Sequence, residues 1–220
     1  MYKIIRYNIN KHGKQMQNLL DKYIIPTYIK RMGLTPDQQS EYAEFEPVLD
    51  PKSAFHKRLK DHSLVAVNGD GKLIGCQTNY FLHKKEVIEE VKNLKKKMIN
   101  ISSSDEEGLL AEYCRHRLRI TNKTVQLLRS YPTVSKAFYL ESTILIPSWR
   151  GQNISAELHS QSLNIVGPEA FVLLEGMMPN EKYDEGINKR SDIGFIKYYA
   201  DFTKDGFACP INYRPPLNDL

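Results

Sequence analysis

The chain has 220 residues, of which 41% are hydrophobic and 26% charged, a composition typical of a soluble globular protein that can form one substantial core. No apolar run approaches the ~20 residues that a membrane helix needs, and the start of the chain lacks the apolar core of a secretion signal, so we expect a cytoplasmic protein with no membrane partner. The three cysteines lack CxxC spacing and the six histidines lack the spacing of zinc ligands, so no metal site is predicted.

The net charge of +5 is concentrated in one segment. Residues Lys84–Lys136 carry 12 Lys/Arg and 7 Asp/Glu, and this difference of five equals the whole net charge. Charges of both signs alternate there with few aromatic residues among them, which is typical of a solvated helical face and not of a nucleic-acid site. We therefore predict a charged helical insert at about residues 84–135 and no nucleic-acid partner.

The part of the chain before this insert predicts a strand, helices, a loop and a hairpin. Apolar residues alternate in the strand and recur at helical spacing in the next segment, which is expected to end near Pro26; a further helix is expected to start at Asp50-Pro51. Asn-Gly-Asp-Gly between two runs of β-forming residues is a strong hairpin signal. The predicted bounds are Lys3–Asn8 for the strand, His12–Tyr28 for the helix, and Ser63–Val67 and Lys72–Phe81 for the hairpin.

After the insert, strands and helices alternate, which predicts an α/β fold with mixed strand directions. The apolar run Phe-Val-Leu-Leu-Glu-Gly-Met suits a strand at the centre of a sheet, covered on both faces. The predicted elements are a strand over Lys136–Ile146 stopped by Pro147, a helix over Ile154–Ile165, a strand over Ala170–Met178, a helix over Asn188–Phe202 and a strand over Phe207–Tyr213.

The turn Pro147–Asn153 between a strand and a helix carries the clearest chemical signal. The first N–H groups of a helix have no partner within the helix, and the helix dipole adds partial positive charge there. Such a turn can bind an anion and suits a pyrophosphate. Gly151 would let the backbone approach the ligand closely, and Arg150 adds a charged fork of donors.

The sequence Ile146–Leu158 resembles the acetyl-CoA motif of the GNAT acetyltransferases, usually written Arg/Gln-x-x-Gly-x-Gly/Ala after a strand that ends in an apolar-x-Pro step. Asn153 stands where Gly is usual and Ser155 where Gly or Ala is usual; Asn tolerates left-handed backbone conformations better than other non-glycine residues. With the order of elements, the resemblance implies a single GNAT domain over residues 1–220, a twisted mixed sheet with helices on both faces, and acetyl-CoA as cosubstrate. The cofactor-binding residues that it implies are Ile144, Leu145, Ile146, Arg150, Gly151, Gln152, Asn153, Ile154 and Ser155.

A second resemblance concerns the acceptor. Glu44-Phe45-Glu46-Pro47-Val48 is similar to the acidic Asp-Glu-Pro-Leu segment of insect-type arylalkylamine N-acetyltransferases, in which the Glu before the Pro is taken as the general base. That resemblance makes Glu46 the candidate base, with Glu141 on the cofactor strand as its rival. A base is needed because an alkylamine with a pKa of ~10.4 is almost wholly protonated at neutral pH.

The acid that protonates the departing thiolate is expected on the predicted helix Asn188–Phe202. The resemblance to the insect-type enzymes suggests Ser191 near its start, and the wider family suggests Tyr198 or Tyr199 further along. The family's usual Leu-Gly-Phe ending matches either Ile193-Gly194-Phe195 or Ala200-Asp201-Phe202, and the second match is preferred because it gives the helix more length.

The resemblances together imply an N-acetyltransferase that transfers acetyl directly from acetyl-CoA to a primary amine, a small arylalkylamine being the first expectation. The alternatives are a polyamine or protein-amine acetyltransferase, and a non-catalytic CoA-binding regulator with the same fold, for which the departures at Asn153 and Ser155 are the support. The oligomeric state stays open, with a homodimer among the options.

Overall fold

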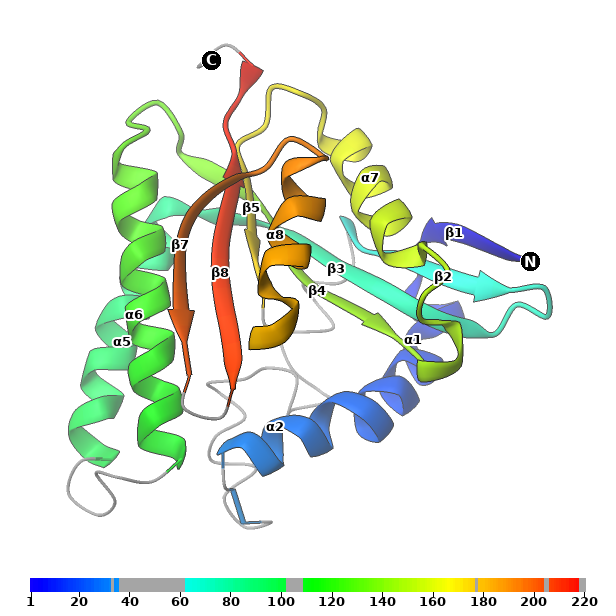
Figure 1. The fold of residues 1–220 in the computed structure, drawn as a ribbon, viewed down its shortest axis with the longest axis horizontal. Helices are drawn as coiled ribbons and strands as arrows, with labels where there is room; N and C mark the ends of the chain where they lie inside the picture. Colours follow the sequence, from blue (N-terminus) through cyan, green and yellow to red (C-terminus); the bar gives the residue numbers. More distant parts are fainter. Residues whose placement is uncertain (33, 36–61, 102–108, 177, 204–205, 218–220) are drawn as a thin grey trace. The chain divides into compact units, whose positions relative to one another are not determined.

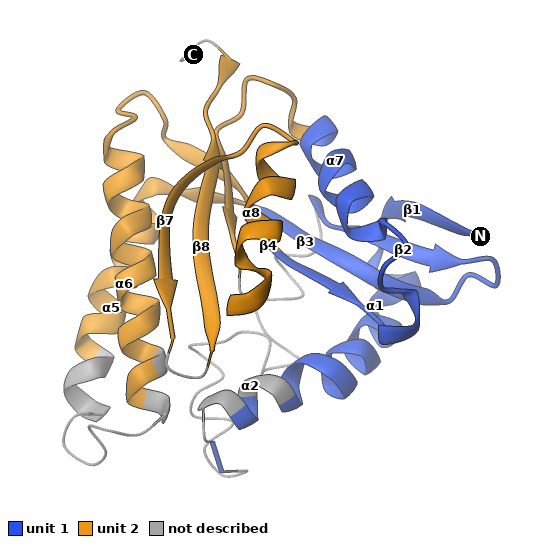
Figure 2. Ribbon diagram, viewed as in Figure 1, with its two compact units in different colours: residues 1–80, 142–165 blue, residues 81–141, 166–220 orange. Residues whose placement is uncertain are grey.

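The computed structural model describes residues 1–32, 34–35, 62–101, 109–176, 178–203 and 206–217. They form a mixed α/β structure in which helices flank an open, multi-stranded sheet, as predicted (Figure 1). The chain divides into two compact units: unit 1 comprises Met1–Tyr80 and Ser142–Ile165, and unit 2 comprises Phe81–Glu141 and Val166–Leu220 (Figure 2). Strands β3 (Leu73–His83) and β4 (Lys136–Leu145) each contribute residues to both units. No described helix is long and apolar enough to cross a membrane.

Unit 1 is built on antiparallel strands. Strand β1 (Tyr2–Arg6) pairs with β2 (Leu64–Asn68), and β2 pairs with β3, with a register shift after Ala66. The predicted hairpin turn is confirmed: the side-chain oxygen of Asn68 accepts the N–H groups of Asp70 and Lys72 at 3.0 and 2.9 Å. These bonds satisfy backbone donors inside the turn, which is why Asn is favoured at its first position.

The N-terminal helix of unit 1 continues past the predicted end at Pro26. Helix α1 (Ile9–Leu19) is followed by a π-helical turn, η1 (Leu20–Ile24), and by α2 (Ile25–Met32), of which Pro26 is the second residue. Proline is tolerated in the first turn of a helix, where its missing N–H would have no partner within the helix, so it follows the π-helical turn without ending the run. Helix α7 (Ile154–Val166) also belongs to this unit and agrees with its prediction to within one residue.

Unit 2 combines parallel and antiparallel strands. Strand β4 runs parallel to β5 (Val172–Glu175), which pairs antiparallel with β8 (Phe207–Arg214). Strand β8 also pairs antiparallel with β6 (Met178–Pro179) and with β7 (Ile196–Phe202). The mixed strand directions predicted from the sequence are therefore present.

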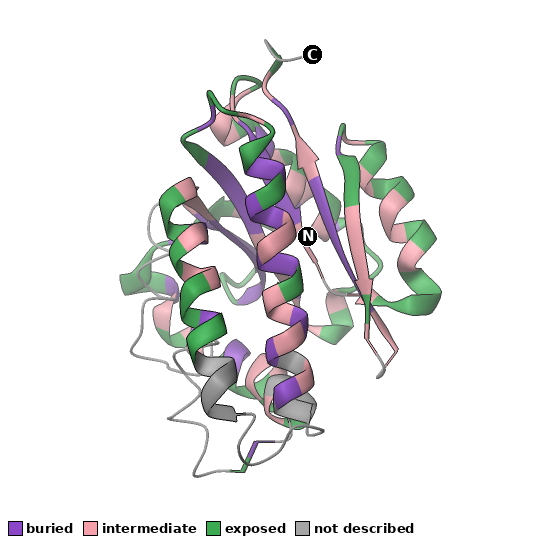
Figure 3. Cartoon of the chain, turned by 90° about the vertical axis from the view of Figure 1, so that its left-hand side faces the viewer, coloured by how far each residue is buried: buried purple, intermediate pink, exposed green. Residues whose placement is uncertain are grey.

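Helices contact both faces of β7. The charged insert holds α5 (Lys84–Ile101) and α6 (Leu109–Arg129), and from α6 the His116 and Arg119 side chains contact the Asp201 carboxylate at 2.8 and 2.7 Å. On the next residue of the strand, the Phe202 ring meets Tyr183 of α8 (Tyr183–Ser191) at a centroid distance of 5.2 Å. Because successive side chains of a strand point to opposite faces, α6 and α8 cover opposite faces of β7. Figure 3 shows buried residues along the strands and along α6.

The predicted helix Asn188–Phe202 is wrong. Helix α8 ends at Ser191, and Tyr198 and Tyr199 lie on β7. Gly194 adopts a φ of 84°, and the N–H groups of Gly194 and Phe195 donate to the carbonyls of Ser191 and Arg190, which closes the helix. Ile193-Gly194-Phe195 is thus the helix ending, and the preference for Ala200-Asp201-Phe202 is corrected. The aromatic run that follows has strand propensity, which the length argument overlooked.

Candidate functional site

The end of β4 presents backbone groups on the edge that faces away from β3. The N–H of Ser142 donates to the Thr78 hydroxyl at 3.0 Å, and the N–H of Ile146 donates to the Ile74 carbonyl at 3.0 Å, both toward β3. Backbone groups alternate in direction along a strand, so the N–H groups of Thr143 and Leu145 point to the other edge. The Leu145 carbonyl also lies there, because it accepts from Arg150 Nε at 3.3 Å.

In unit 2, the same strand leaves its parallel neighbour before it ends. The pairing of β4 with β5 runs from Phe138↔Val172 to Leu140↔Leu174, and β4 continues to Leu145. Where a strand extends beyond its last residue paired with a neighbouring strand, its backbone N–H groups on that edge have no strand partner. Such donors can bind an extended ligand or a developing oxyanion.

The turn after β4 has the backbone conformation that an anion site needs. Pro147–Trp149 form one 3₁₀ turn, η3, after which Gly151 has a φ of 82° and Asn153 a φ of 62°. Asn153 is the one non-glycine residue with positive φ in the described part of the chain. It therefore adopts the left-handed conformation that the usual glycine would adopt, and the departure from the family pattern keeps the turn.

Helix α7 begins directly after this turn. The Asn153 carbonyl accepts the Glu157 N–H at 3.1 Å, the first bond of the helix, so helix geometry leaves the N–H groups of Ile154 and Ser155 without partners inside it. A Cβ on Gly151 would have nothing within 4 Å, so the space in front of this glycine is open. Unpartnered donors, the helix dipole and an open approach together favour an oxyanion such as a pyrophosphate.

A small apolar core holds this helix start against the strands of unit 1. Ile154 and Leu158 are buried against Leu64, Ala66 and Ile74, and Leu145, Ile146 and Trp149 pack around them. At the side of the helix, the Tyr2 hydroxyl donates to the Glu157 carboxylate at 2.5 Å. The turn is thus fixed by residues of β1, β2 and β3, which is the rigid support that precise ligand binding needs.

A polar chain that the sequence did not reveal also ties β4 to α7. The Thr143 hydroxyl donates to the fully buried Gln77 amide oxygen and lies 2.8 Å from His159 Nε2. Because the single hydroxyl proton goes to Gln77, His159 must donate from Nε2, which fixes that nitrogen as protonated. Nothing in the spacing of these residues distinguishes them from ordinary polar positions, so no sequence signal could have found them.

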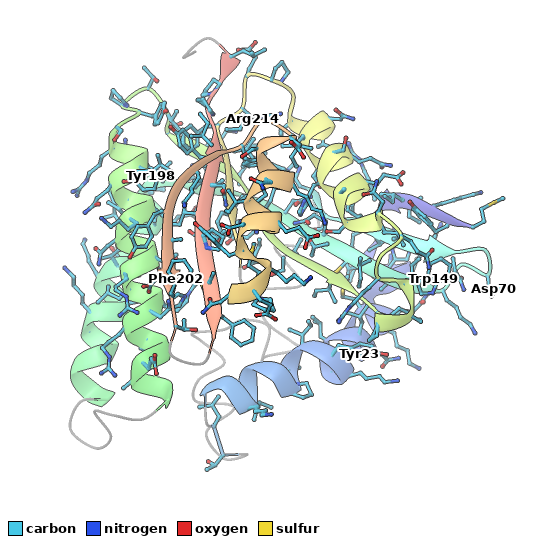
Figure 4. All side chains as sticks on the ribbon, in the orientation of Figure 1. Tyr23, Asp70, Trp149, Tyr198, Phe202 and Arg214 are labelled. Atoms are coloured by element: carbon cyan, nitrogen blue, oxygen red, sulfur yellow. The ribbon has the colours of Figure 1, made fainter. Side chains whose placement is uncertain are left out.

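The predicted catalytic residues do not lie on the turn or on the end of β4. Glu46 lies outside the described residues. Ser191 ends α8, where its carbonyl accepts the Gly194 N–H, and Tyr198 lies exposed on β7 with its ring edge-on to Tyr213 at 6.3 Å (Figure 4). Glu141 lies on β4, partly buried, shortly before the Thr143 and Leu145 amides.

The thiol nearest in sequence to this polar chain, Cys76, precedes Gln77 on β3. Burial raises the pKa of the Cys76 thiol to about 12, so it stays protonated and unreactive at neutral pH. The described residues contain no group of His, Cys, Asp and Glu side chains arranged to hold a metal ion.

Comparison with known proteins places this geometry in a known fold. No protein-family profile and no curated protein sequence matches the chain. Solved structures do match: arylalkylamine N-acetyltransferase 2 from Aedes aegypti has a TM-score of 0.66 at 16% identity, over 97% of this chain and 98% of that one. The polyamine N-acetyltransferase of Drosophila melanogaster, which forms N-acetylagmatine, has a TM-score of 0.63 at 10% identity, over 97% and 98% of the two chains. The chain therefore has the fold of the GNAT acetyltransferases.

Proposed function

We propose that the protein is an acetyl-CoA-dependent N-acetyltransferase that acts on a small primary amine. The observation that carries the proposal is the turn at Gly151–Asn153, which keeps two positive φ angles at the start of α7 although one of its positions is not glycine. A decayed turn would have no reason to keep this strained conformation. The free edge of β4 next to the turn offers the extended set of amides that a pantetheine arm and a thioester carbonyl require.

The roles of the residues follow from their chemistry. The N–H groups of Ile154 and Ser155, with Arg150, would hold the pyrophosphate, and the N–H groups of Thr143 and Leu145 would bind the pantetheine arm and the carbonyl oxygen of the thioester. Glu46 remains the proposed base, by resemblance, and Glu141 the rival. Ser191, at the end of α8, and Tyr198, on β7, remain the proposed acids that protonate the departing thiolate.

The acceptor is proposed to be an arylalkylamine. The Aedes aegypti neighbour is an arylalkylamine N-acetyltransferase and the Drosophila melanogaster neighbour a polyamine N-acetyltransferase. A test must therefore include both classes. A thiol-release assay with acetyl-CoA should compare tyramine and dopamine with spermidine, agmatine and a lysine peptide. Fastest turnover with the aryl amines is expected, and fastest turnover with agmatine would correct the substrate class.

The cofactor placement has a matched control within the chain. Gly151 and Gly167 have φ angles of 82° and 74°, a Cβ on either would have nothing within 4 Å, and they flank the two ends of α7. Gly151→Ala and Gly167→Ala therefore introduce the same backbone strain, and only the first changes the proposed pyrophosphate turn. We expect Gly151→Ala to weaken acetyl-CoA binding by about tenfold and Gly167→Ala to leave it unchanged. Equal acetyl-CoA affinities for the two variants would show that the pyrophosphate does not bind at this turn.

A further inference from the structure

Two buried polar atoms on α8 of unit 2 have no partner. The Tyr183 hydroxyl and Arg190 Nη1 are shielded from solvent, and neither makes a hydrogen bond in the described part of the chain. Tyr183 and Arg190 stand seven residues apart, two helical turns, so both project from one side of the helix. The Arg190 guanidinium covers Gly176, where a Cβ would lie 2.2 Å from Nη2 and 3.3 Å from Nη1.

No ion pair to Arg190 is seen among the described residues. Burial lowers the pKa of Arg190 to about 10, so the side chain remains cationic at neutral pH. Glu185, the acidic residue on the same helix for which ion pairs are seen, contacts Lys189 at 2.5 Å and Lys182 at 3.6 Å. A buried cation and a buried hydroxyl without acceptors are unfavourable, unless a ligand supplies the acceptor.

We propose that Tyr183 and Arg190 bind the carboxylate of a small ligand. One cationic and one neutral donor supply a single charge and two hydrogen bonds, which match the charge and the two oxygens of a carboxylate better than a phosphate dianion. Phe202, 54% exposed, lies edge-on to Tyr183 and suits a ligand with an aromatic body. The Lys197 ammonium, 5.0 Å from the centre of the same tyrosine ring, is a second cation beside these two donors, so the binding test must include a phosphate.

The position of the site within unit 2 indicates what the ligand is for. Gly176 follows β5 two residues after Leu174, where the ladder between β4 and β5 ends. On the proposed function, the acceptor is held in unit 2, the unit that contains both Arg190 and this ladder. We infer, resting on that function, that the acceptor amine carries a carboxylate, as an aromatic amino acid does.

Binding tests the site without any turnover. Calorimetry should compare 3-phenylpropionate with its neutral amide, 3-phenylpropanamide, and with phenyl phosphate. We expect the carboxylate to bind at least about tenfold more tightly than the amide, because a hydrogen bond to a charged group is worth that much, and more tightly than the phosphate. Equal binding of acid and amide, or no binding of either, would overturn the site; tighter binding of phenyl phosphate would overturn the assignment to a carboxylate.

Variants separate a ligand site from a structural role. Arg190→Met and Tyr183→Phe should each weaken 3-phenylpropionate binding, and Lys189→Met, which removes an exposed charge from the same helix, should not. The unfolding temperature of ligand-free Arg190→Met should equal or exceed that of the parent, because an unpaired buried cation has been removed. A marked loss of stability in Arg190→Met, together with unchanged binding in Tyr183→Phe, would show that the arginine is structural and overturn the proposal.

Turnover distinguishes this inference from the proposed function. The ratio of kcat/KM for tyrosine to that for tyramine should fall in Arg190→Met relative to the parent. If 3-phenylpropionate binds but no amine is acetylated, the proposed function fails and the carboxylate site stands. If tyramine is acetylated and the ratio is the same in both proteins, the function stands and the carboxylate-bearing acceptor is wrong.

Discussion

The φ of 62° at Asn153 gives the most informative perturbation of the cofactor site. A left-handed backbone costs an ordinary L-residue about 1–2 kcal/mol, asparagine less, and glycine nothing. If the turn relaxes when no ligand is bound, a variant whose residue 153 disfavours this φ must return to it when acetyl-CoA binds. The free energy of that return is lost from the binding free energy. Such a cost of 1–2 kcal/mol corresponds to about 5- to 30-fold in acetyl-CoA affinity.

We therefore expect Asn153→Gly to bind acetyl-CoA as well as the parent or up to about threefold better, and Asn153→Val to bind at least about 30-fold less tightly. Valine is worse than the average residue because its branched Cβ makes positive φ a clear outlier, and because its bulk would crowd the pyrophosphate. Calorimetry measures the affinity, and chemical denaturation of the free proteins shows how much strain appears as lost stability instead.

Asn153→Asp is the matched control, because Asp also tolerates positive φ but adds a negative charge to an anion site. Its free energy of unfolding should stay near that of the parent while its acetyl-CoA affinity falls. Equal acetyl-CoA affinities for Asn153→Gly and Asn153→Val would contradict this expectation. That result would mean that the turn before α7 is not where the pyrophosphate binds.

Three further predictions concern other parts of the chain. Gly75→Ala should lower the free energy of unfolding by about 1–3 kcal/mol in chemical denaturation, because its Cβ would lie 2.7 Å from the Ile144 carbonyl oxygen; unchanged stability would contradict this close approach. Because burial raises the pKa of Cys76 from 9.0 to about 12, the unfolded chain loses this proton first as the pH rises, so stability should fall between about pH 9 and 12, and Cys76→Ala should show a shallower fall over that range. Glu46→Gln should lower turnover by roughly 10²–10⁴-fold, with a smaller loss at higher pH, and barely change acetyl-CoA affinity; collapse in Glu141→Gln alone would move the base to β4.

The elements with strong local signals were predictable from the sequence. The Asn68–Gly71 hairpin and the strand–turn–helix around Asn153 carry their own turn chemistry and resembled a known motif, so their structure follows from nearby residues. The departure from the motif at Asn153 also predicted a positive φ there, because Asn is the non-glycine residue best suited to replace glycine in that conformation.

The elements that depend on tertiary context were not predictable. The end of α8 at Ser191 was missed for another reason: the length argument extended the helix past Gly194, although that glycine and the aromatic run after it are local signals for a helix end and a strand. Arg190 Nη1 and the Tyr183 hydroxyl, which have no hydrogen-bond partner among the described residues, carry no signal in sequence, since an arginine and a tyrosine on a charged helix are usually solvated.

The central claim is tested most directly by one measurement: the release of free thiol from acetyl-CoA in the presence of a primary amine, with the acetylated amine identified by mass spectrometry. We expect the purified protein to release one thiol for each acetylated amine formed, and only when both acetyl-CoA and the amine are present. Saturable binding of acetyl-CoA without thiol release, across aryl amines, polyamines, amino acids and a lysine peptide, would contradict it and leave a protein that binds the cosubstrate without using it.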